Sequence, residues 1–198
     1  MDARVIIFLG RSGSGKGTQA KLLKATLEEK FGTDKVLYFE SGDVFRAYIE
    51  KGSYSSTLSK KVMEEGGLQP NFLAVRGWAN FFVDHFTGNE RIIIDGSPRT
   101  EMEAQELDRA LTFYGLKASV VYLNISRDEA VRRLEARGRS DDASKENIKK
   151  RMDWFEQCVE PVLTHYREGN QNIFLDINGE QDIDAIHREV LKQTGLLQ

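Results

Sequence analysis

Five short apolar runs recur along the chain, and the stretches between them carry helical spacing. Apolar runs of this length without polar alternation are typical of strands that are buried on both faces. Because strands and helices alternate, we expect an α/β fold of three layers, in which helices cover both faces of a five-stranded parallel sheet. The predicted strands are Val5–Leu9, Val36–Phe39, Arg91–Ile94, Ser119–Leu123 and Asn172–Ile177.

Two segments do not fit this alternation. Residues 41–86 contain only helical patterns, which is far more chain than one crossover between strands needs. Breaks at Gly66-Gly67 and at Pro70 divide this segment, so we expect a small helical lobe. Residues 137–145 are polar and lie between two helical stretches, as expected for a short loop.

Local signals mark the ends of two helices. Residues Lys16–Lys30 have the pattern of a helix that ends at Gly32. The helix before the polar loop begins with Ser126, and Glu129 follows three positions later, which is the spacing of a capping box. Both signals support the predicted order of elements.

Length and composition narrow the class of protein. A chain of 198 residues, 40% apolar and 30% charged, is expected to be one soluble globular domain with a sizeable core. A net charge of −3 argues against general nucleic-acid or membrane binding. No apolar stretch reaches the roughly 18–20 residues that span a bilayer. A strand begins within a few residues of Met1, so no signal peptide is evident and a cytoplasmic protein is expected.

The single cysteine and the two tryptophans are expected to have structural roles. Cys158 is the single cysteine, which excludes an intrachain disulfide, and we expect it to pack as a small apolar side chain. Trp78 and Trp154 fall within helical apolar patterns. Both indole rings are therefore expected in the core or at an interface.

A glycine-rich segment follows the first apolar run directly. A buried strand that opens into such a turn and then a lysine predicts a phosphate-binding loop, and hence binding of a nucleoside triphosphate. Glycines let backbone N–H groups converge on phosphate oxygens, and Lys16 adds positive charge where the helix dipole is also positive. The alternative is a glycine-rich turn without a ligand. The segment is Gly10, Arg11, Ser12, Gly13, Ser14, Gly15, Lys16, Gly17 and Thr18.

A carboxylate, Asp95, follows the third apolar run. Ligands of parallel sheets gather at the carboxyl ends of the strands, so Asp95 is expected beside the phosphate-binding loop. Such an aspartate holds Mg²⁺ directly or through its waters, because this hard cation prefers oxygen ligands and keeps several waters. The alternative role is a helix cap or a turn. Gly17 stands directly after the lysine, where the simplest phosphate-loop pattern has serine or threonine.

Several motifs in one order resemble those of adenylate kinases, in the nucleoside monophosphate kinase family. The resemblance covers the whole chain. It implies a core at 1–40, 71–136 and 146–198, a monophosphate-binding lobe at 41–70, and a lid at 137–145 that is shorter than the family's short form. The motifs are the phosphate-binding loop, Ser41-Gly42-Asp43-x-x-Arg46, Gly66-x-Leu68-x-Pro70, Asp95-Gly96-x-Pro98-Arg99 and Arg137…Arg139-x-Asp141-Asp142.

The resemblance also implies an activity and its site. The reaction would be ATP + AMP ⇌ 2 ADP with Mg²⁺, which Asp95 anchors through water, in a monomer that binds neither nucleic acid nor membrane. The implied ATP-binding residues are Arg11, Ser12, Gly13, Ser14, Gly15, Lys16, Gly17, Thr18, Arg133, Arg137 and Gly179. The implied AMP-binding residues are Ser41, Gly42, Arg46, Gly67, Leu68, Gln69, Gly96, Arg99, Glu103, Arg139 and Arg151.

Arginines carry a physical argument of their own. Phosphoryl transfer spreads negative charge over the equatorial oxygens, so catalysis is mostly positioning and charge neutralisation. The planar fork of arginine binds phosphate oxygens and stays charged. The resemblance implies that Arg46 and Arg99 hold the acceptor phosphate. It also implies a catalytic set around the transferring group of Lys16, Arg99, Arg133, Arg137, Arg139 and Arg151. The alternative is surface pairing with acidic neighbours.

Two aspartates of the polar loop are implied to close the lid. Asp141 and Asp142 would do so by hydrogen bonds or ion pairs, and the alternative for Asp142 is an N-cap of the following helix.

Recognition of the acceptor base is where the chain departs from the family. Adenylate kinases place a glutamine where this chain has Glu103. An ionised glutamate cannot donate to adenine N1, but it can accept from the N1–H and N2–H₂ groups of guanine. Gln105 could substitute for the missing glutamine, and Gln69 brings another amide near the expected base site. Ser41 resembles the residue that the family has at the base, and it favours AMP.

Three other functions stay open on the sequence. The first is the same fold with GMP, CMP or UMP as acceptor. The second is a small-molecule kinase that phosphorylates a hydroxyl with Asp43 as base. The third is a nucleotide-binding protein without turnover. No general base stands out, and a monophosphate acceptor needs none because it is already an oxyanion near neutral pH.

Overall fold

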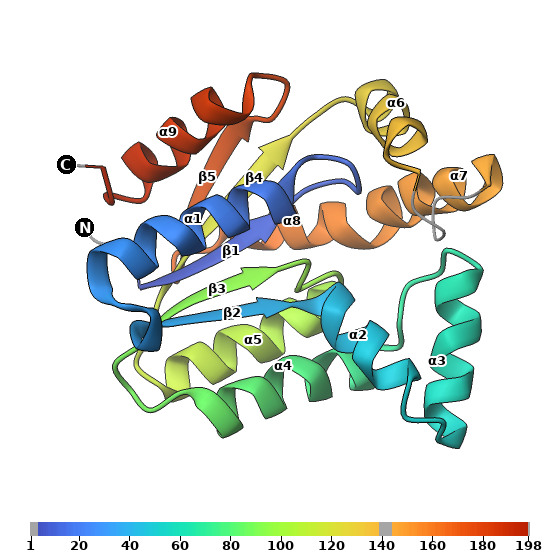
Figure 1. The fold of residues 1–198 in the computed structure, drawn as a ribbon, viewed down its shortest axis with the longest axis horizontal. Helices are drawn as coiled ribbons and strands as arrows, with labels where there is room; N and C mark the ends of the chain where they lie inside the picture. Colours follow the sequence, from blue (N-terminus) through green and yellow to red (C-terminus); the bar gives the residue numbers. More distant parts are fainter. Residues whose placement is uncertain (1–3, 139–143, 198) are drawn as a thin grey trace.

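A sheet of five parallel strands forms the centre of the molecule (Figure 1). The computed structural model describes residues 4–138 and 144–197 of the chain. The strand order is β2-β3-β1-β4-β5, and each predicted strand agrees with the observed one to within one residue at either end. The predicted α/β fold is therefore confirmed. The strands are β1 (Val5–Leu9), β2 (Val36–Glu40), β3 (Arg91–Asp95), β4 (Ala118–Asn124) and β5 (Ile173–Asn178).

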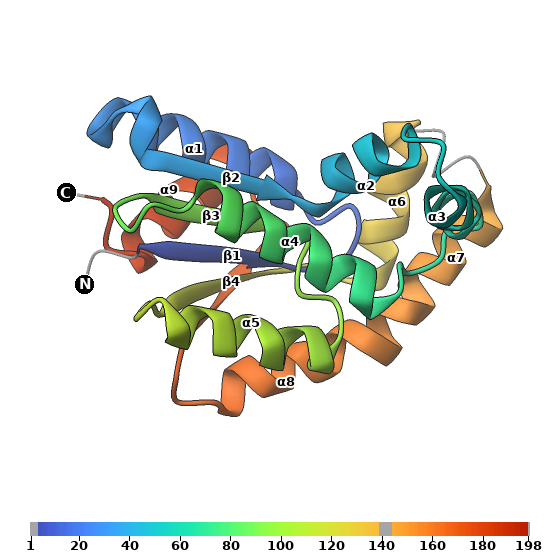
Figure 2. The ribbon, with the colours of Figure 1, turned by 90° about the horizontal axis from the view of Figure 1, so that it is seen from below.

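Helices cover both faces of the sheet (Figure 2). Helices α1 and α9 pack on one face, and α4, α5 and α8 pack on the other. A short 3₁₀ turn, η1 (Thr33–Lys35), leads into β2, and a π-helical turn, η3 (Phe155–Val159), joins α7 to α8. The helices are α1 (Lys16–Phe31), α2 (Ser41–Ile49), α3 (Tyr54–Glu64), α4 (Asn71–His85), α5 (Glu101–Phe113), α6 (Arg127–Arg137), α7 (Lys145–Trp154), α8 (Glu160–Glu168) and α9 (Ile183–Gln193).

Strand β1 shows why the sheet needs helices on both sides. Side chains alternate between the two faces of a strand. Val5, Ile7 and Leu9 pack in the core under α4, α5 and α8, whereas Ile6 and Phe8 pack under α1 and α9. All five are at most 2% exposed. Burying each large apolar side chain stabilises the fold by about 1.5–3 kcal/mol, so an uninterrupted apolar strand belongs at the centre of this sheet.

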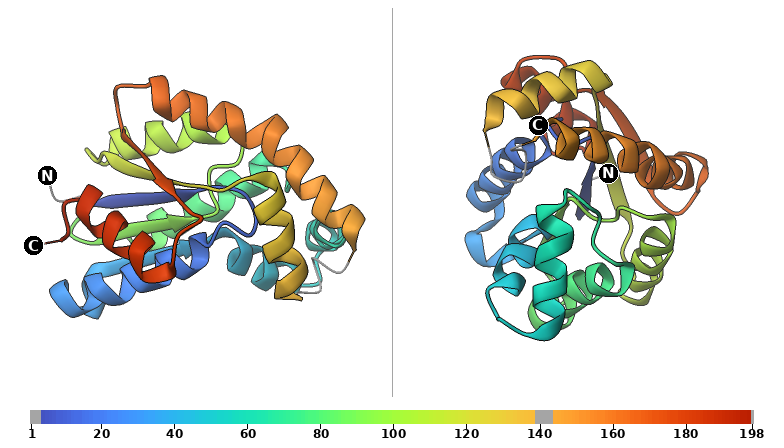
Figure 3. Two further views of the ribbon diagram at one scale, coloured as in Figure 1. Left: turned by 90° about the horizontal axis from the view of Figure 1, so that it is seen from above. Right: turned by 90° about the vertical axis from the view of Figure 1, so that its right-hand side faces the viewer.

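The segment between β2 and β3 is helical throughout, as predicted. It forms α2, α3 and α4, and the last of these begins directly after Pro70. Helices α2 and α3 stand apart from the sheet and face α6 and α7 (Figures 1 and 3). We call residues 41–70 the helical lobe. Within the part of the chain that the structure describes, no helix is long and apolar enough to cross a bilayer.

The polar loop falls partly outside the described residues. Helix α6 ends at Arg137, and Gly138 follows in the left-handed conformation. Arg139, Asp141 and Asp142 lie outside the described residues. The N-cap of α7 is Ser144, whose hydroxyl accepts a hydrogen bond from the Asn147 amide at 3.0 Å. Ser144 is thus the N-cap of α7, and the expectations for Asp142 fall outside the described residues.

The predicted capping box at the start of α6 is half formed. The Ser126 hydroxyl accepts from the Glu129 amide at 3.3 Å, as expected. The Glu129 carboxylate does not return the bond, because it pairs with Arg132 and Arg133 one turn further along the helix. The Ser126 amide donates instead to Glu180 at 2.7 Å. Glu129 thus holds an arginine of the predicted site.

Candidate active site

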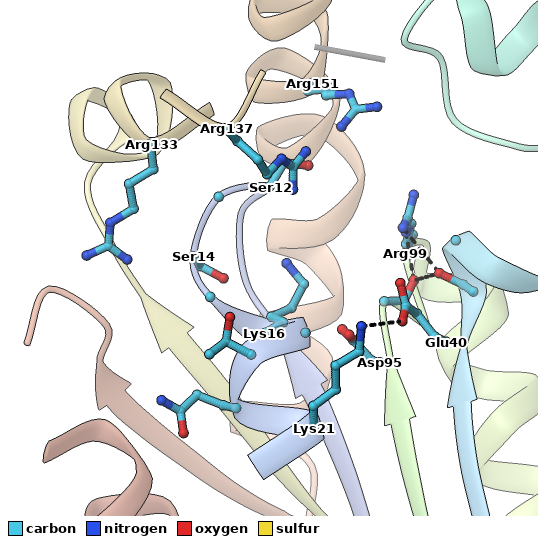
Figure 4. A pocket seen from close by; sticks show the side chains of 18 of the residues that line it. Ser12, Ser14, Lys16, Lys21, Glu40, Asp95, Arg99, Arg133, Arg137 and Arg151 are labelled. Carbon is cyan, nitrogen blue, oxygen red and sulfur yellow. Dashed lines mark hydrogen bonds and ion pairs between the residues drawn. The ribbon is translucent and has the colours of Figure 1, made fainter. Parts of the chain in front are cut away.

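A cleft of about 580 Å³ opens at the carboxyl ends of β1, β2 and β3. The helical lobe forms one wall, and α6 and α7 form the other (Figure 4). The sequence predicted its site residues from five separate motifs, and the fold brings most of them here. Those that line the cleft are Ser12, Gly13, Ser14, Gly15, Lys16, Gly17, Thr18, Ser41, Gly42, Arg46, Gly67, Gln69, Asp95, Gly96, Arg99, Arg133, Arg137 and Arg151.

The phosphate-binding loop has the compact form that its glycines permit. Gly13 has a φ of 87°, and a Cβ atom there would lie 2.9 Å from the carbonyl oxygen of Ala130. Any larger residue would push the loop away from α6. Gly15 is the N-cap of α1, so the free amides of the first helical turn face the cleft. This geometry is typical of a site for phosphate oxygens.

Lys16 curls back over the loop from the first turn of α1. Its Nζ atom donates to the carbonyl oxygens of Gly10 and Arg11, each at 2.8 Å. Burial lowers the pKa of Lys16 to about 8, while the Asp95 carboxylate opposes this shift and nearby arginines add to it. The ammonium group is therefore held in place before any anion binds, in surroundings that favour an added negative charge.

Arg11 is the exception within the loop. Its guanidinium lies 4.4 Å from the centre of the Phe155 ring and pairs with Glu156 at 3.2 Å and Glu160 at 3.4 Å. Glu156 also accepts two bonds from Arg127 at 2.9 Å. The Arg11 side chain thus ties the loop to η3 and α8, and only its backbone can serve a ligand in the cleft.

Asp95 ends β3 deep in the cleft, with 5% of its surface exposed. The Tyr38 hydroxyl lies 3.4 Å from its carboxylate and 3.2 Å from that of Glu40, its neighbour in register on β2. Burial raises the pKa of Asp95, although Lys16 opposes the shift. A Cβ atom at Gly17 would lie 3.3 Å from the Asp95 Oδ2 atom, so glycine leaves room in front of this carboxylate.

Those features fit a hydrated magnesium ion. A carboxylate oxygen is the hard donor that this ion prefers, and the space beside Gly17 leaves the Asp95 carboxylate accessible. Among the residues that the structure describes, no group of three or more His, Cys, Asp or Glu side chains could hold a metal ion by itself. Asp95 is the residue here that could anchor the ion through water.

On the other side of the cleft, Arg99 is fixed by three contacts. Its Nε atom donates to the Gly96 carbonyl at 2.7 Å, and its Nη2 atom donates to the Ser41 hydroxyl at 3.2 Å. The guanidinium carbon lies 5.5 Å from the centre of the Trp154 ring. Burial lowers the pKa of Arg99, but arginine remains charged at any physiological pH. An oriented cation therefore faces the cleft.

Arg46 is held by two carboxylates, that of Asp43 in the helical lobe and that of Glu40 at the end of β2, the latter at 3.2 Å. Lys21 lies 3.8 Å from the same Glu40 carboxylate (Figure 4). Sequence reasoning missed Glu40, Lys21 and Tyr38, although all three line or support the cleft. The position of Glu40 at a strand end, directly before the Ser41 motif, was the available signal.

Further arginines reach the cleft from α6 and α7 (Figure 4). Arg133 donates to Glu129 at 2.6 Å and to the Gly179 carbonyl at 3.0 Å. Gly179 itself is tied to the Asn124 carbonyl at 2.8 Å. Arg137 follows one turn later on α6, and Arg151 comes from α7. Cations from the start of α1, from the segment after β3 and from α6 and α7 thus converge on one space, as a polyphosphate ligand requires.

Glu103 has a structural partner that the sequence reasoning overlooked. The Thr100 hydroxyl accepts from the Glu103 amide at 3.2 Å, and the Glu103 carboxylate accepts from the Arg99 amide at 2.8 Å. Thr100 and Glu103 therefore cap α5 in the manner of a capping box, which their spacing could have revealed. Burial raises the pKa of Glu103, which is 1% exposed.

A small recess beside the main cleft holds the predicted base-reading residues. Leu68, Gln69 and Glu103 line it together with Ser41. The Gln69 amide is bonded to Ser59 through both its oxygen, at 2.8 Å, and its nitrogen, at 2.9 Å. Both the oxygen and the nitrogen of the Gln69 amide therefore bond to a residue of the same lobe.

The structure also places Gln105 and the two tryptophans. Gln105 is exposed on α5 and bonds to Glu101, so it does not take the place of Glu103. Trp78 is buried in the core as expected, and Trp154 packs against the same core while it also lines the cleft.

Comparisons with known proteins agree with this geometry. The family model for adenylate kinase matches residues 8–171. Adenylate kinase from Bacteroides thetaiotaomicron is 32% identical over 93% of this chain and 95% of its own length. Adenylate kinase isoenzyme 1 from Cyprinus carpio is 30% identical over 96% of this chain and 94% of its own, and adenylate kinase from Thermus thermophilus is 29% identical over 98% of each. The chain therefore belongs to the adenylate kinase family and is a nucleoside monophosphate kinase, a phosphotransferase.

Proposed function

We propose that the protein transfers the terminal phosphoryl group of ATP to AMP, in the reaction ATP + AMP ⇌ 2 ADP with Mg²⁺. The observation that carries this proposal is the arrangement of cations on both sides of one cleft. The phosphate-binding loop and Lys16 lie on one side, and Arg99 and Arg46 lie on the other. Two phosphate-bearing substrates can meet between them.

On the donor side, the amides of residues 12–18 and the ammonium of Lys16 bind the ATP phosphates. Arg133 and Arg137 lie at the α6 wall, where they neutralise charge on the transferring group. Arg139 is assigned to the same group on the resemblance alone. Asp95 holds the waters of Mg²⁺, which when bound neutralises phosphate charge and orients the transferring group.

On the acceptor side, Arg99 and Arg46 bind the phosphate of AMP, and Arg151 closes the space from α7. The base lies toward the recess lined by Ser41, Leu68 and Glu103. Burial raises the pKa of Glu103, while the Arg99 charge and hydrogen bonds to the carboxylate oppose this shift. The protonated carboxyl has one donor and one acceptor, as glutamine has, and fits adenine, whereas the ionised form only accepts and fits guanine. The choice of acceptor therefore reports the protonation state of Glu103.

A hydroxyl acceptor is less well supported. Asp43, the one candidate for a general base, has 64% of its side chain exposed and is bound to Arg46. We expect Asp43→Ala to retain phosphoryl transfer to a monophosphate, since that reaction needs no base.

The test is an ADP-forming assay of the purified protein with ATP and Mg²⁺ against AMP, GMP, CMP and UMP. We expect AMP to be the fastest acceptor, and Glu103→Gln to keep AMP activity because it preserves one donor and one acceptor. Preference for GMP would mean that Glu103 is ionised in the recess. No transfer to any of the four monophosphates would overturn the proposal.

A further inference from the structure

Helix α7 bonds to the helical lobe across the mouth of the cleft. The Asn147 side chain donates to the carbonyl oxygen of Glu64 at 3.1 Å, and the Trp154 indole N–H donates to that of Gly66 at 3.2 Å. Residues seven positions apart lie on one face of a helix, so both donors point the same way. Two hydrogen bonds therefore join α7 to the lobe.

The two acceptors are carbonyl groups at the end of α3. The last carbonyls of a helix have no partner within the helix, and they need donors from elsewhere. Approach is close, because a Cβ atom at Gly66 would lie 3.2 Å from the Cβ atom of Asn147. Gly66 has a φ of 69°, which glycine adopts without strain. The end of α3 is thus shaped to receive α7.

Trp154 makes a second contact, with the predicted acceptor site. The centre of its ring lies 5.5 Å from the guanidinium carbon of Arg99, within the range of a cation–π interaction. The ring is half-buried and lines the cleft together with Arg99 and Gly67. One side chain therefore touches the lobe through its N–H group and Arg99 through its ring.

We propose that Trp154 is a positioning residue that couples attachment of the helical lobe to alignment of Arg99. The indole N–H bonds the lobe while its ring contacts the Arg99 guanidinium. The position of the lobe and the orientation of Arg99 therefore depend on the same side chain. Asn147 strengthens the attachment without touching Arg99. The inference rests on the proposed function in one respect, namely that Arg99 binds the acceptor phosphate.

The coupling predicts that substitutions at this contact change the KM for AMP and leave the KM for ATP unchanged. Trp154→Phe keeps the ring and removes the N–H donor, and we expect it to raise the KM for AMP about 2- to 10-fold, as for loss of one hydrogen bond. Asn147→Ala removes the other bond, and we expect a similar rise. Trp154→Leu also removes the ring, and we expect it to lower kcat as well, with the KM for ATP unchanged in all three variants.

The control is Lys149→Ala, a change at a residue of α7 whose amine bonds Asp153 on the same helix. We expect it to leave both KM values unchanged. A second readout is the fluorescence of Trp154 in a Trp78→Phe background, which we expect to change when AMP is added and to stay constant when sodium chloride is added to equal ionic strength. Trp78 is the one other tryptophan.

Three outcomes separate the possibilities. An equal rise in both KM values, or thermal destabilisation without any change in KM, would show a merely structural role and overturn the coupling. If Trp154→Phe does not fold, Asn147→Ala provides the test. A rise in the KM for AMP with an unchanged KM for ATP then supports the coupling, and an equal rise in both overturns it. A wild-type protein that is silent with all four monophosphates overturns the proposed function as well, whereas an active wild type with unsplit constants overturns the coupling alone.

Discussion

The two sides of the cleft are built in different ways. On the donor side, the phosphate-binding loop follows directly from β1, and Lys16 is held by the carbonyls of the loop itself. On the acceptor side, Arg99 depends on Ser41 and Trp154, which come from the helical lobe and from α7. The phosphate-binding loop of the donor side is thus formed by one continuous segment, whereas Arg99 on the acceptor side is oriented by contacts between separate elements.

The difference predicts which changes each side tolerates. A local site keeps its geometry while the surrounding helices shift, because its bonds lie within a few residues of one another. An assembled site changes whenever one of its contributing elements moves. We therefore expect the largest single effects on the donor side and graded, acceptor-specific effects on the other.

The largest effect is expected for Lys16→Met. The change removes a partly buried cation that we propose to bind the ATP phosphates, and loss of one such electrostatic group typically costs about 10²- to 10³-fold in rate. Steady-state kcat with ATP and AMP measures it. Lys24→Met, on the same helix but paired with Glu28, is the control and should leave kcat unchanged. A loss below tenfold would show that the loop amides alone suffice.

Arg99→Lys tests the acceptor side. A lysine lacks the planar fork that reaches both Gly96 and Ser41, so the cation is no longer oriented. We expect kcat/KM for AMP to fall about 10- to 100-fold, as for one hydrogen bond to a charged group, with the KM for ATP unchanged. Arg91→Lys, at the opposite end of β3, serves as the control. A matching rise in the KM for ATP would contradict the separation of the two sides.

The pH dependence of kcat/KM should also distinguish the donor side from the acceptor side. Lys16 has a pKa of about 8 in the free enzyme, below its ordinary value, so it is charged below pH 8 and loses its proton as the pH rises further. The kcat/KM for ATP is therefore expected to fall above pH 8, approaching tenfold per pH unit. Bound phosphate favours the charged lysine, so kcat at saturating ATP should persist to higher pH. A profile that stays flat to pH 10 would refute this assignment.

The smallest effect is expected for Glu40→Gln. The Glu40 carboxylate pairs with Arg46, and removing its charge leaves that arginine more available to an acceptor phosphate. A partly exposed ion pair contributes about 0–1 kcal/mol, so the KM for AMP should fall by at most about fivefold. Glu50→Gln, exposed at the end of α2, is the control. A rise in the KM would mean that Glu40 positions Arg46.

The sequence was most informative where structure is local. Apolar runs located the five strands of the described residues, most clearly β1, which is buried along its whole length and so excludes polar residues. The edge strand β5 is partly exposed and includes Asp176. The glycine-rich loop was recognisable because its conformation depends on residues within one short segment. The same held for the break at Gly66-Gly67, where α3 ends and the chain turns toward α4.

Side-chain directions were not predictable in this way. Arg11 belongs to the phosphate-binding loop by position, yet Glu156 and Glu160, far along the chain, draw its side chain toward α8. Glu103 was interpreted as a base reader, and its bond to the Arg99 amide depends on how α5 begins. Trp154 fits a core pattern, and only the approach of α3 gives its N–H a partner at the cleft. The outcomes for Arg11 and Trp154 depend on contacts between distant segments, whereas that for Glu103 is local and follows from its spacing from Thr100.

The π-helical turn η3 restricts deletions in this part of the chain. A wide turn adds one residue to an otherwise regular helix, and one residue corresponds to a rotation of about 100°. It therefore sets the rotational phase of α7 relative to α8, whose Val162 and Tyr166 are fixed in the core. Deleting a single residue between Phe155 and Val159 would restore a regular helix and turn Arg151 and Trp154 away from the cleft. The number of residues in this segment is therefore fixed by the site that lies before it.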